Sequence, residues 1–178
     1  APVFGPDPGN PALSLFGNPS NGTPAGSTVY AGPGLAGAGY SAQLFAIVGA
    51  GQPESALLPA TPITSFRTGS AAGFVVATTA TLQGVPKDAA VATLQLRVWD
   101  NQGGTLGTWE AARAAWEGGL IAAGKSQLFE VTSIGGDLNP SANITGLRSF
   151  NIYLIPEPST FALAGLGAAA LMIFRRRK

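Results

Sequence analysis

An uninterrupted apolar segment beside a block of cations constrains this chain more than any other feature. Residues 161–174 read FALAGLGAAALMIF, without a charged side chain, and RRRK follows directly at 175–178. A helix over 159–174 would be about 24 Å long, slightly less than the roughly 30 Å hydrocarbon core of a bilayer. A run of this length is also seen in buried core helices and signal-type segments, but the adjacent cations favour a short transmembrane helix.

The cations also give the predicted helix a direction. Arginine and lysine beside a membrane span stay on the cytoplasmic side, so we expect the preceding residues to lie outside the cytoplasm. Nothing after Ala1 resembles a signal peptide, so we expect that an export signal has been removed. The predicted topology residues are Arg175, Arg176, Arg177 and Lys178. The predicted membrane anchors are Phe161, Leu163, Leu166, Leu171, Ile173 and Phe174.

A short proline motif precedes the apolar segment. Pro156-Glu157-Pro158, followed by Ser-Thr, the apolar run and the basic cluster, resembles the PEP-CTERM sorting domain of Gram-negative bacteria over residues 155–178. The resemblance implies recognition of these three residues by an exosortase, an integral-membrane processing enzyme. It also implies anchoring in the inner membrane with the body outside the cytoplasm, then a place at the cell surface or in the extracellular matrix. Physically, two prolines also suit a linker that keeps the backbone extended.

Several segments of the body resemble parts of uncharacterised PEP-CTERM surface proteins. This resemblance implies no activity that can be transferred to the chain. The segments are 42–45, 66–69, 96–100 and 124–126.

The composition of the body excludes several classes of function. The sequence has no His and no Cys, which excludes zinc fingers, iron–sulfur clusters, cysteine nucleophiles and Ser-His-Asp triads. Ahead of the basic tail (175–178) stand six basic and nine acidic residues, a net charge of −3. Nucleic-acid binding needs a clustered basic face, so we expect no nucleic-acid partner.

The distribution of proline and glycine divides the chain into three parts. Ten of the 14 prolines lie in the first 62 residues. We predict a Pro/Gly-rich N-terminal arm (1–27), a β-sandwich body (28–155) and a sorting signal (156–178), with a transmembrane helix at 159–174 and a basic tail at 175–178.

Strands are predicted where apolar and polar residues alternate between turn residues. Residues 91–99 are the clearest case: Thr93, Gln95 and Arg97 alternate with apolar neighbours, as in a sheet with one buried face. The predicted strands are 28–31, 40–49, 64–67, 73–82, 90–100, 127–132 and 147–155.

One short helix interrupts the strands, at residues 108–117, with Thr108 as its N-cap. Seven or eight short strands with local turns favour an all-β fold, a β-sandwich with a jelly roll as one form.

Few residues of the body suggest a binding site, and we predict neither catalytic residues nor a cofactor. Trp99, Trp109 and Trp116 are candidates for a sugar-stacking platform, although large aromatics more often fill a sandwich core. Asp100 and Asn101 form a weak Ca²⁺ candidate, for which a plain turn is the favoured alternative.

These features favour a non-enzymatic exported protein with a structural or adhesive role in an exopolysaccharide or biofilm context. Its partners would be an exosortase-like enzyme, the inner membrane and, beyond them, exopolysaccharide or copies of itself. The alternatives are a carbohydrate-binding module, a self-assembling filament subunit and a hydrolase with paired carboxylates.

Overall fold

The computed structural model describes residues 2–3, 16–17, 28–29 and 34–155. Two long antiparallel strands, β4 (Gly37–Val48) and β7 (Val91–Asp100), form its centre. Their register runs from Tyr40 opposite Asp100 to Val48 opposite Ala92. The alternation of side chains in both strands produces this pairing, because it places one apolar row of each strand on the same face.

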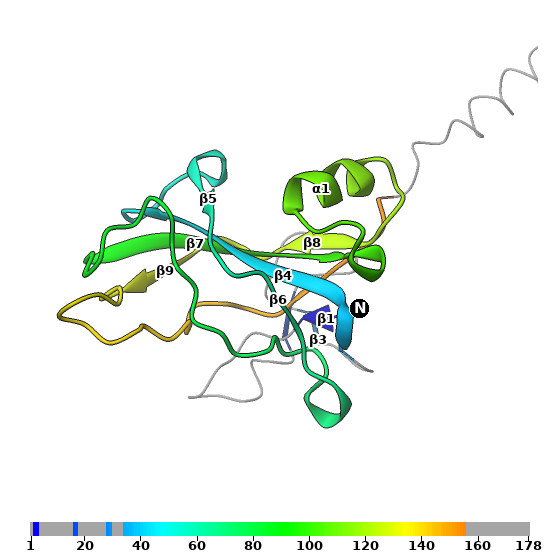
Figure 1. Ribbon diagram of the computed structural model, residues 1–178, viewed down its shortest axis with the longest axis horizontal. Coiled ribbons are helices and arrows are strands. Elements are labelled where there is room, and N and C mark those ends of the chain that lie inside the picture. The colour runs from blue at the N-terminus through cyan, green and yellow to red at the C-terminus, as the bar shows by residue number, and fades with distance from the viewer. Residues whose placement is uncertain (1, 4–15, 18–27, 30–33, 156–178) are drawn as a thin grey trace, which may run out of the picture.

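Short strands line both edges of the central pair and complete a six-stranded antiparallel sheet (Figure 1). The edge strands are β5 (Leu58–Pro59) and β6 (Thr64–Phe66) beside β4, and β8 (Ala123–Lys125) and β9 (Phe129–Thr132) beside β7.

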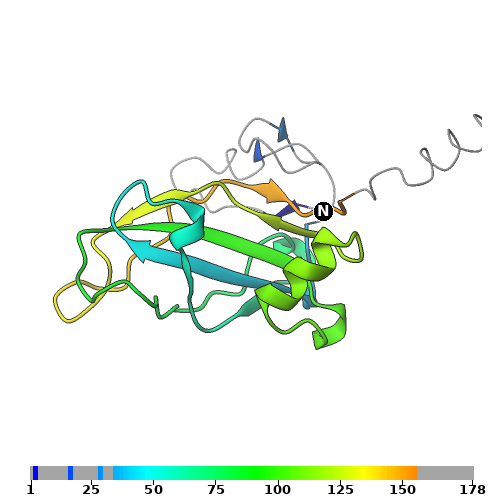
Figure 2. The same cartoon turned by 90° about the horizontal axis from the view of Figure 1, so that it is seen from above.

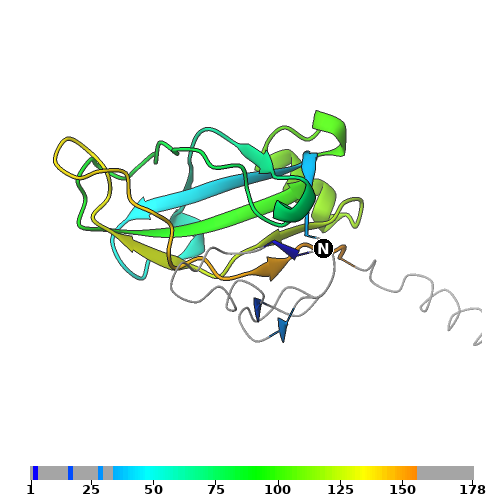
Figure 3. The same cartoon turned by 90° about the horizontal axis from the view of Figure 1, so that it is seen from below.

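Two small ribbons bring the N-terminal part of the chain onto the body. One joins β1 (Pro2–Val3) to β10 (Phe150–Asn151), and the other joins β2 (Phe16–Gly17) to β3 (Thr28–Val29). Figure 3 shows β1 beside β10 at the edge of the body.

A helix covers part of one face of the sheet. Helix α1 (Trp109–Glu117) begins where the Thr108 hydroxyl accepts a hydrogen bond from the Ala111 amide at 3.4 Å. It ends in a Schellman-type turn, in which Gly119 takes a positive φ of 70°. Figure 2 shows α1 and the segment that carries β5 lying over this face. Residues 34–155 also contain three short 3-10 turns: η2 (Glu54–Ala56), η3 (Gly69–Ala71) and η4 (Gln102–Gly104).

Each face of the sheet buries its own hydrophobic core. The face opposite α1 carries the main core: Leu35, Ala42, Ala46, Phe66, Ala92, Leu94, Leu96, Val98, Phe129, Val131, Ile134, Leu147, Phe150 and Ile152. The face under α1 carries the tryptophan core: Phe45, Leu57, Trp99, Trp109, Ala112, Trp116, Ile121 and Ala123.

Over the described residues, the structure confirms an all-β fold with one short α-helix, and it corrects several details. Residues 73–82 do not form a continuous strand; they contribute isolated bridges at Val75 and Thr81. Of 147–155, only Phe150–Asn151 is a strand, followed by a bridge at Tyr153. The face of β7 that carries Gln95 and Arg97 is buried rather than solvated, because α1 and η2 close over it.

The sandwich, the domain boundaries and the C-terminal helix remain predictions. The described strands build one main sheet and two ribbons, so the sandwich stays a prediction, as do the three domain boundaries. The transmembrane helix and the basic tail lie outside the described residues. In the part of the chain that the structure does describe, no helix combines the length and hydropathy of a membrane span.

Candidate functional site

The end of the body is held firmly at the point where the chain continues into the proline motif. Tyr153 and Ala123 exchange two backbone hydrogen bonds of 3.0 and 3.2 Å. The indole N–H of Trp116 donates to the Tyr153 carbonyl oxygen at 2.8 Å, and the two rings meet edge to face at 5.2 Å. Ile155 then packs against the tryptophan core. The residue before Pro156 is therefore still part of the folded body.

Close packing between β8 and the last strand requires a glycine. A Cβ atom at Gly124 would lie 2.5 Å from the Asn151 carbonyl oxygen and 3.2 Å from the Cα of Ile152. Contacts this short do not occur, so any larger residue would push the C-terminal segment away from β8. The position of the junction thus depends on Gly124 as well as on Trp116.

The three tryptophans named as a sugar platform are interior side chains. Trp99, Trp109 and Trp116 are 0%, 3% and 6% exposed. Their rings form a chain of tilted and edge-to-face contacts with centroids 5.8 and 6.0 Å apart. They present no open face on which a sugar ring could stack. Their role is to fix α1 and the junction to the sheet.

A charged cluster lies beside the tryptophan core. Glu54 accepts a hydrogen bond from Lys125 at 2.6 Å and one from the Gln95 amide at 3.2 Å. An Arg97 Nη lies 3.7 Å from the Glu54 carboxylate, and Arg97 Nε donates to Gln95 at 2.9 Å. The guanidinium carbon also lies 3.8 Å from the centroid of the Phe45 ring. The four polar residues are therefore bound to each other across three elements of the fold.

The pKa shifts in this cluster follow from burial and pairing. Burial raises the pKa of Glu54, but the hydrogen bonds from Lys125 and Gln95 and the charges of Lys125 and Arg97 outweigh it, and the net pKa is lowered. Burial also lowers the pKa of Arg97, although Glu54 opposes this effect. No local sequence pattern predicts this cluster, because its members are far apart in the chain. One sequence feature could have indicated the cluster: Gln95 and Arg97 are polar residues in the middle of a long, otherwise largely apolar strand, β7.

The Ca²⁺ candidates serve as turn residues. The Asp100 carboxylate accepts from the Gln102 backbone amide at 2.9 Å, and the side-chain Oδ1 of Asn101 accepts from the Gly104 backbone amide at 3.1 Å. The Asn101 amide group also donates to the Ala38 carbonyl at 2.8 Å. Throughout 34–155, no group of three or more acidic residues gathers as a metal site.

Asp88 anchors a loop at the opposite end of the sheet. Its carboxylate accepts three backbone hydrogen bonds, from the amides of Asp137, Leu138 and Asn139, at 2.8–3.0 Å. The hydrogen bond from Asn139 is the main cause of a lowered pKa of Asp88. The Lys87 ammonium adds an ion pair with Asp137 at 2.7 Å.

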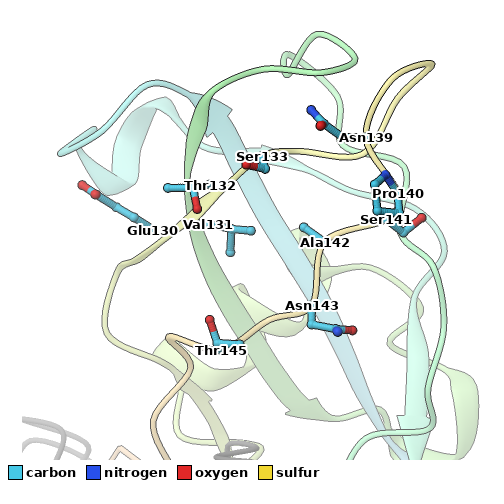
Figure 4. A pocket seen from close by; sticks show the side chains of 10 residues that line it. All are labelled: Glu130, Val131, Thr132, Ser133, Asn139, Pro140, Ser141, Ala142, Asn143 and Thr145. Atoms are coloured by element: carbon cyan, nitrogen blue, oxygen red, sulfur yellow. The ribbon is translucent and has the colours of Figure 1, made fainter.

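A hollow of about 350 Å³ lies beside this loop (Figure 4). Its lining consists mainly of hydroxyl and amide groups. Glu130, the one acidic lining residue, points its carboxylate away from the other lining side chains, and this carboxylate accepts a hydrogen bond from the Gly51 amide at 2.9 Å. Two facing carboxylates, which glycoside hydrolysis needs, are not found among its lining residues. The lining residues are Glu130, Val131, Thr132, Ser133, Asn139, Pro140, Ser141, Ala142, Asn143 and Thr145.

The sorting, anchor and topology residues predicted from the sequence lie outside the described residues. They are Pro156, Glu157, Pro158, Phe161, Leu163, Leu166, Leu171, Ile173, Phe174, Arg175, Arg176, Arg177 and Lys178.

Comparison with known proteins identifies the segment that begins at the junction. Residues 154–178 match the PEP-CTERM protein-sorting motif. No curated protein and no solved structure gives a significant match. The motif implies export, membrane anchoring before processing, and processing by an exosortase, which is a membrane enzyme. The chain therefore carries a PEP-CTERM protein-sorting motif, the mark of an exported protein that an exosortase sorts.

Proposed function

We propose that this chain is a non-enzymatic cell-surface or extracellular-matrix protein. Its body is a structural or adhesive module that works in an exopolysaccharide or biofilm context, after sorting by the C-terminal motif. The observation that carries this proposal is the match to the sorting motif at 154–178, which starts on the last residues of the folded body.

The contacts of the charged side chains support a structural rather than a catalytic body. Glu54, Arg97 and Lys125 are engaged with each other, and Asp88 is occupied by three backbone amides. Acid–base catalysis requires a titratable group within reach of a substrate. These groups instead join β7, β8, η2 and the 134–141 loop to one another.

The surface hollow supports contact with a hydroxyl-rich polymer. Thr132, Ser141, Asn143 and Thr145 offer donors and acceptors that match sugar hydroxyls. Without a stacking ring among the lining residues, each contact would be weak. Such weak contacts suit a protein that is retained in a matrix through many copies.

The first experiment tests sorting by measuring the intact mass of the protein from its native cells. Processing within or after the motif predicts a mass that lacks the C-terminal segment, and a full-length mass when Pro156→Ala, Glu157→Ala and Pro158→Ala are combined. Pro140→Ala, in an exposed loop of the body, is the matched control and should be processed normally. A full-length mass for the unaltered protein would refute processing.

A self-assembling subunit is a second candidate, and the pairing of β1 with β10 favours it. Two residues of the N-terminal arm complete the edge of the body, which is the kind of contact that copies of a protein can exchange. Exchange predicts oligomers in sedimentation velocity and monomers after deletion of residues 1–4. An unaltered chain that sediments as a monomer at all concentrations would exclude this candidate.

A further inference from the structure

Two strongly exposed leucines lie where the body ends. Leu120 is 72% exposed and Leu154 is 55% exposed. Tyr153 pairs with Ala123 in an antiparallel bridge, so the residues after Tyr153 run beside those before Ala123. The backbone amide of Leu120 donates to the Ala115 carbonyl at 2.9 Å, which fixes it to the end of α1. Figure 1 shows the orange end of the described chain beside the turn that follows α1.

The sequence places this end of the body close to the predicted membrane helix. Only Pro156, Glu157 and Pro158 separate Ile155 from the predicted helix at 159–174. Three residues span at most about 11 Å, whereas the headgroup layer beside the hydrocarbon is roughly 5–8 Å thick. Because Ile155 packs against the tryptophan core, we expect no residues of the body before Pro156 to lengthen this linker. Even a fully extended linker would therefore hold the end that carries the two leucines no more than about 3–6 Å beyond the headgroup layer.

The charge near this end is compatible with contact with lipid. Arg113 and Glu117 of α1 form an ion pair of 2.7 Å, so their charges cancel. Moving exposed leucine side chains from water to the boundary between headgroups and acyl chains lowers the free energy. The short linker to the predicted membrane helix and the exposed leucines thus both indicate the lipid surface as the partner of this end of the body.

We propose that the Leu120 and Leu154 end of the body docks on the outer lipid surface of the membrane while the tail is inserted. This inference rests on the proposed function, because it needs the tail to span the membrane. Docking orients the body with the end of β7 toward the bilayer and its start, near Asp88, away from it. It also presents the sorting motif at the level of the headgroups. A membrane-embedded exosortase would then meet its recognition residues at a fixed depth.

The test uses the absence of cysteine from the sequence. Leu120→Cys and Leu154→Cys are made singly in the full chain and labelled with an environment-sensitive fluorophore. Leu138→Cys is the matched control: it is 88% exposed, and it lies near Asp88 and the start of β7, whereas Leu120 lies near its end. Leu166→Cys reports on insertion of the tail. Each labelled chain is reconstituted into vesicles of phosphatidylethanolamine and phosphatidylglycerol.

Docking predicts strong quenching of the probes at positions 120 and 154 by nitroxide lipids, at least about threefold stronger than at 138. It also predicts weaker quenching by aqueous iodide at 120 and 154 than at 138. Adding Leu120→Ser to the chain labelled at 154 should reduce the lipid quenching there, because it removes the remaining leucine of the proposed contact. Unchanged near-UV circular dichroism checks that each variant is folded.

Three results would overturn the proposal. If the probe at 166 is quenched by lipid while those at 120 and 154 behave like the probe at 138, docking is wrong but the tail still inserts. If the probe at 166 is also unquenched by lipid, both docking and the membrane span on which it rests are wrong. If iodide is excluded from 120 and 154 without lipid quenching, a second copy of the chain covers this surface instead.

Discussion

The guanidinium carbon of Arg97 lies 3.8 Å from the centroid of the Phe45 ring, in the middle of a sheet face that also buries tryptophan. The two residues are diagonal neighbours, because Arg97 is opposite Gln43 and Phe45 is opposite Gln95. The cation is thus held between an aromatic ring and the Glu54 carboxylate, and its side chain is only 10% exposed. These contacts compensate the cost of burying a charged guanidinium inside the body.

Arg97→Ala should lower the free energy of unfolding by about 2–4 kcal/mol, because it removes a buried stem, the stacking contact and one partner of Glu54. Arg113→Ala, which breaks an exposed, solvent-screened ion pair on α1, should lower the free energy of unfolding far less than Arg97→Ala does. Urea unfolding followed by tryptophan fluorescence measures both. Equal losses in the two variants would contradict the structural role assigned to Arg97.

Trp116→Phe should loosen the junction, because it deletes the indole N–H that donates to the Tyr153 carbonyl oxygen. We expect faster amide hydrogen exchange at 150–155 and a loss of stability of about 1–3 kcal/mol. Trp109→Phe is the control, since in the described part of the chain the Trp109 indole N–H makes no hydrogen bond. Similar exchange at 150–155 in the two variants would show that the hydrogen bond does not hold the junction.

Gly124→Ala should destabilise the body by at least about 2 kcal/mol, because its Cβ would collide with the backbone of Asn151. Gly39→Ala, in β4, has open space around the added Cβ and should change stability by less than about 0.5 kcal/mol. Thermal unfolding of both variants provides the comparison. A stable Gly124→Ala protein would mean that the C-terminal segment does not lie against β8 as described.

The loop held by Asp88 should weaken in acid. The pKa of Asp88 is lowered in the folded state, chiefly by the hydrogen bond from Asn139, so its stabilising effect is present above the unfolded pKa of about 3.9 and disappears as the pH falls through the folded pKa. Asp88→Asn retains a side chain that tolerates the positive φ of 59° but does not titrate. The stability difference between the two proteins should shrink from pH 6 to pH 2. A constant difference over this range would refute the carboxylate's role.

Local sequence signals predicted the elements whose determinants are adjacent in the chain. Thr108 and the Ala-rich segment before Gly118 predicted α1, because capping and helix propensity act within one turn. The alternation at 91–99 predicted β7 for the same reason. The strands β5 and β8, of two and three residues, carry no such signal, and partners from distant parts of the chain define them.

The sequence by itself determined the sorting motif, because Pro-Glu-Pro, the apolar run and the basic cluster act through composition and order along the chain. Only the tertiary structure decided which polar residues are exposed. Gln95 and Arg97 alternate with apolar neighbours as solvent-facing residues would, yet α1 and η2 cover them and Glu54 and Lys125 pair with them. Burial depends on segments that fold back from far along the chain, and the pattern within one strand contains no information about them.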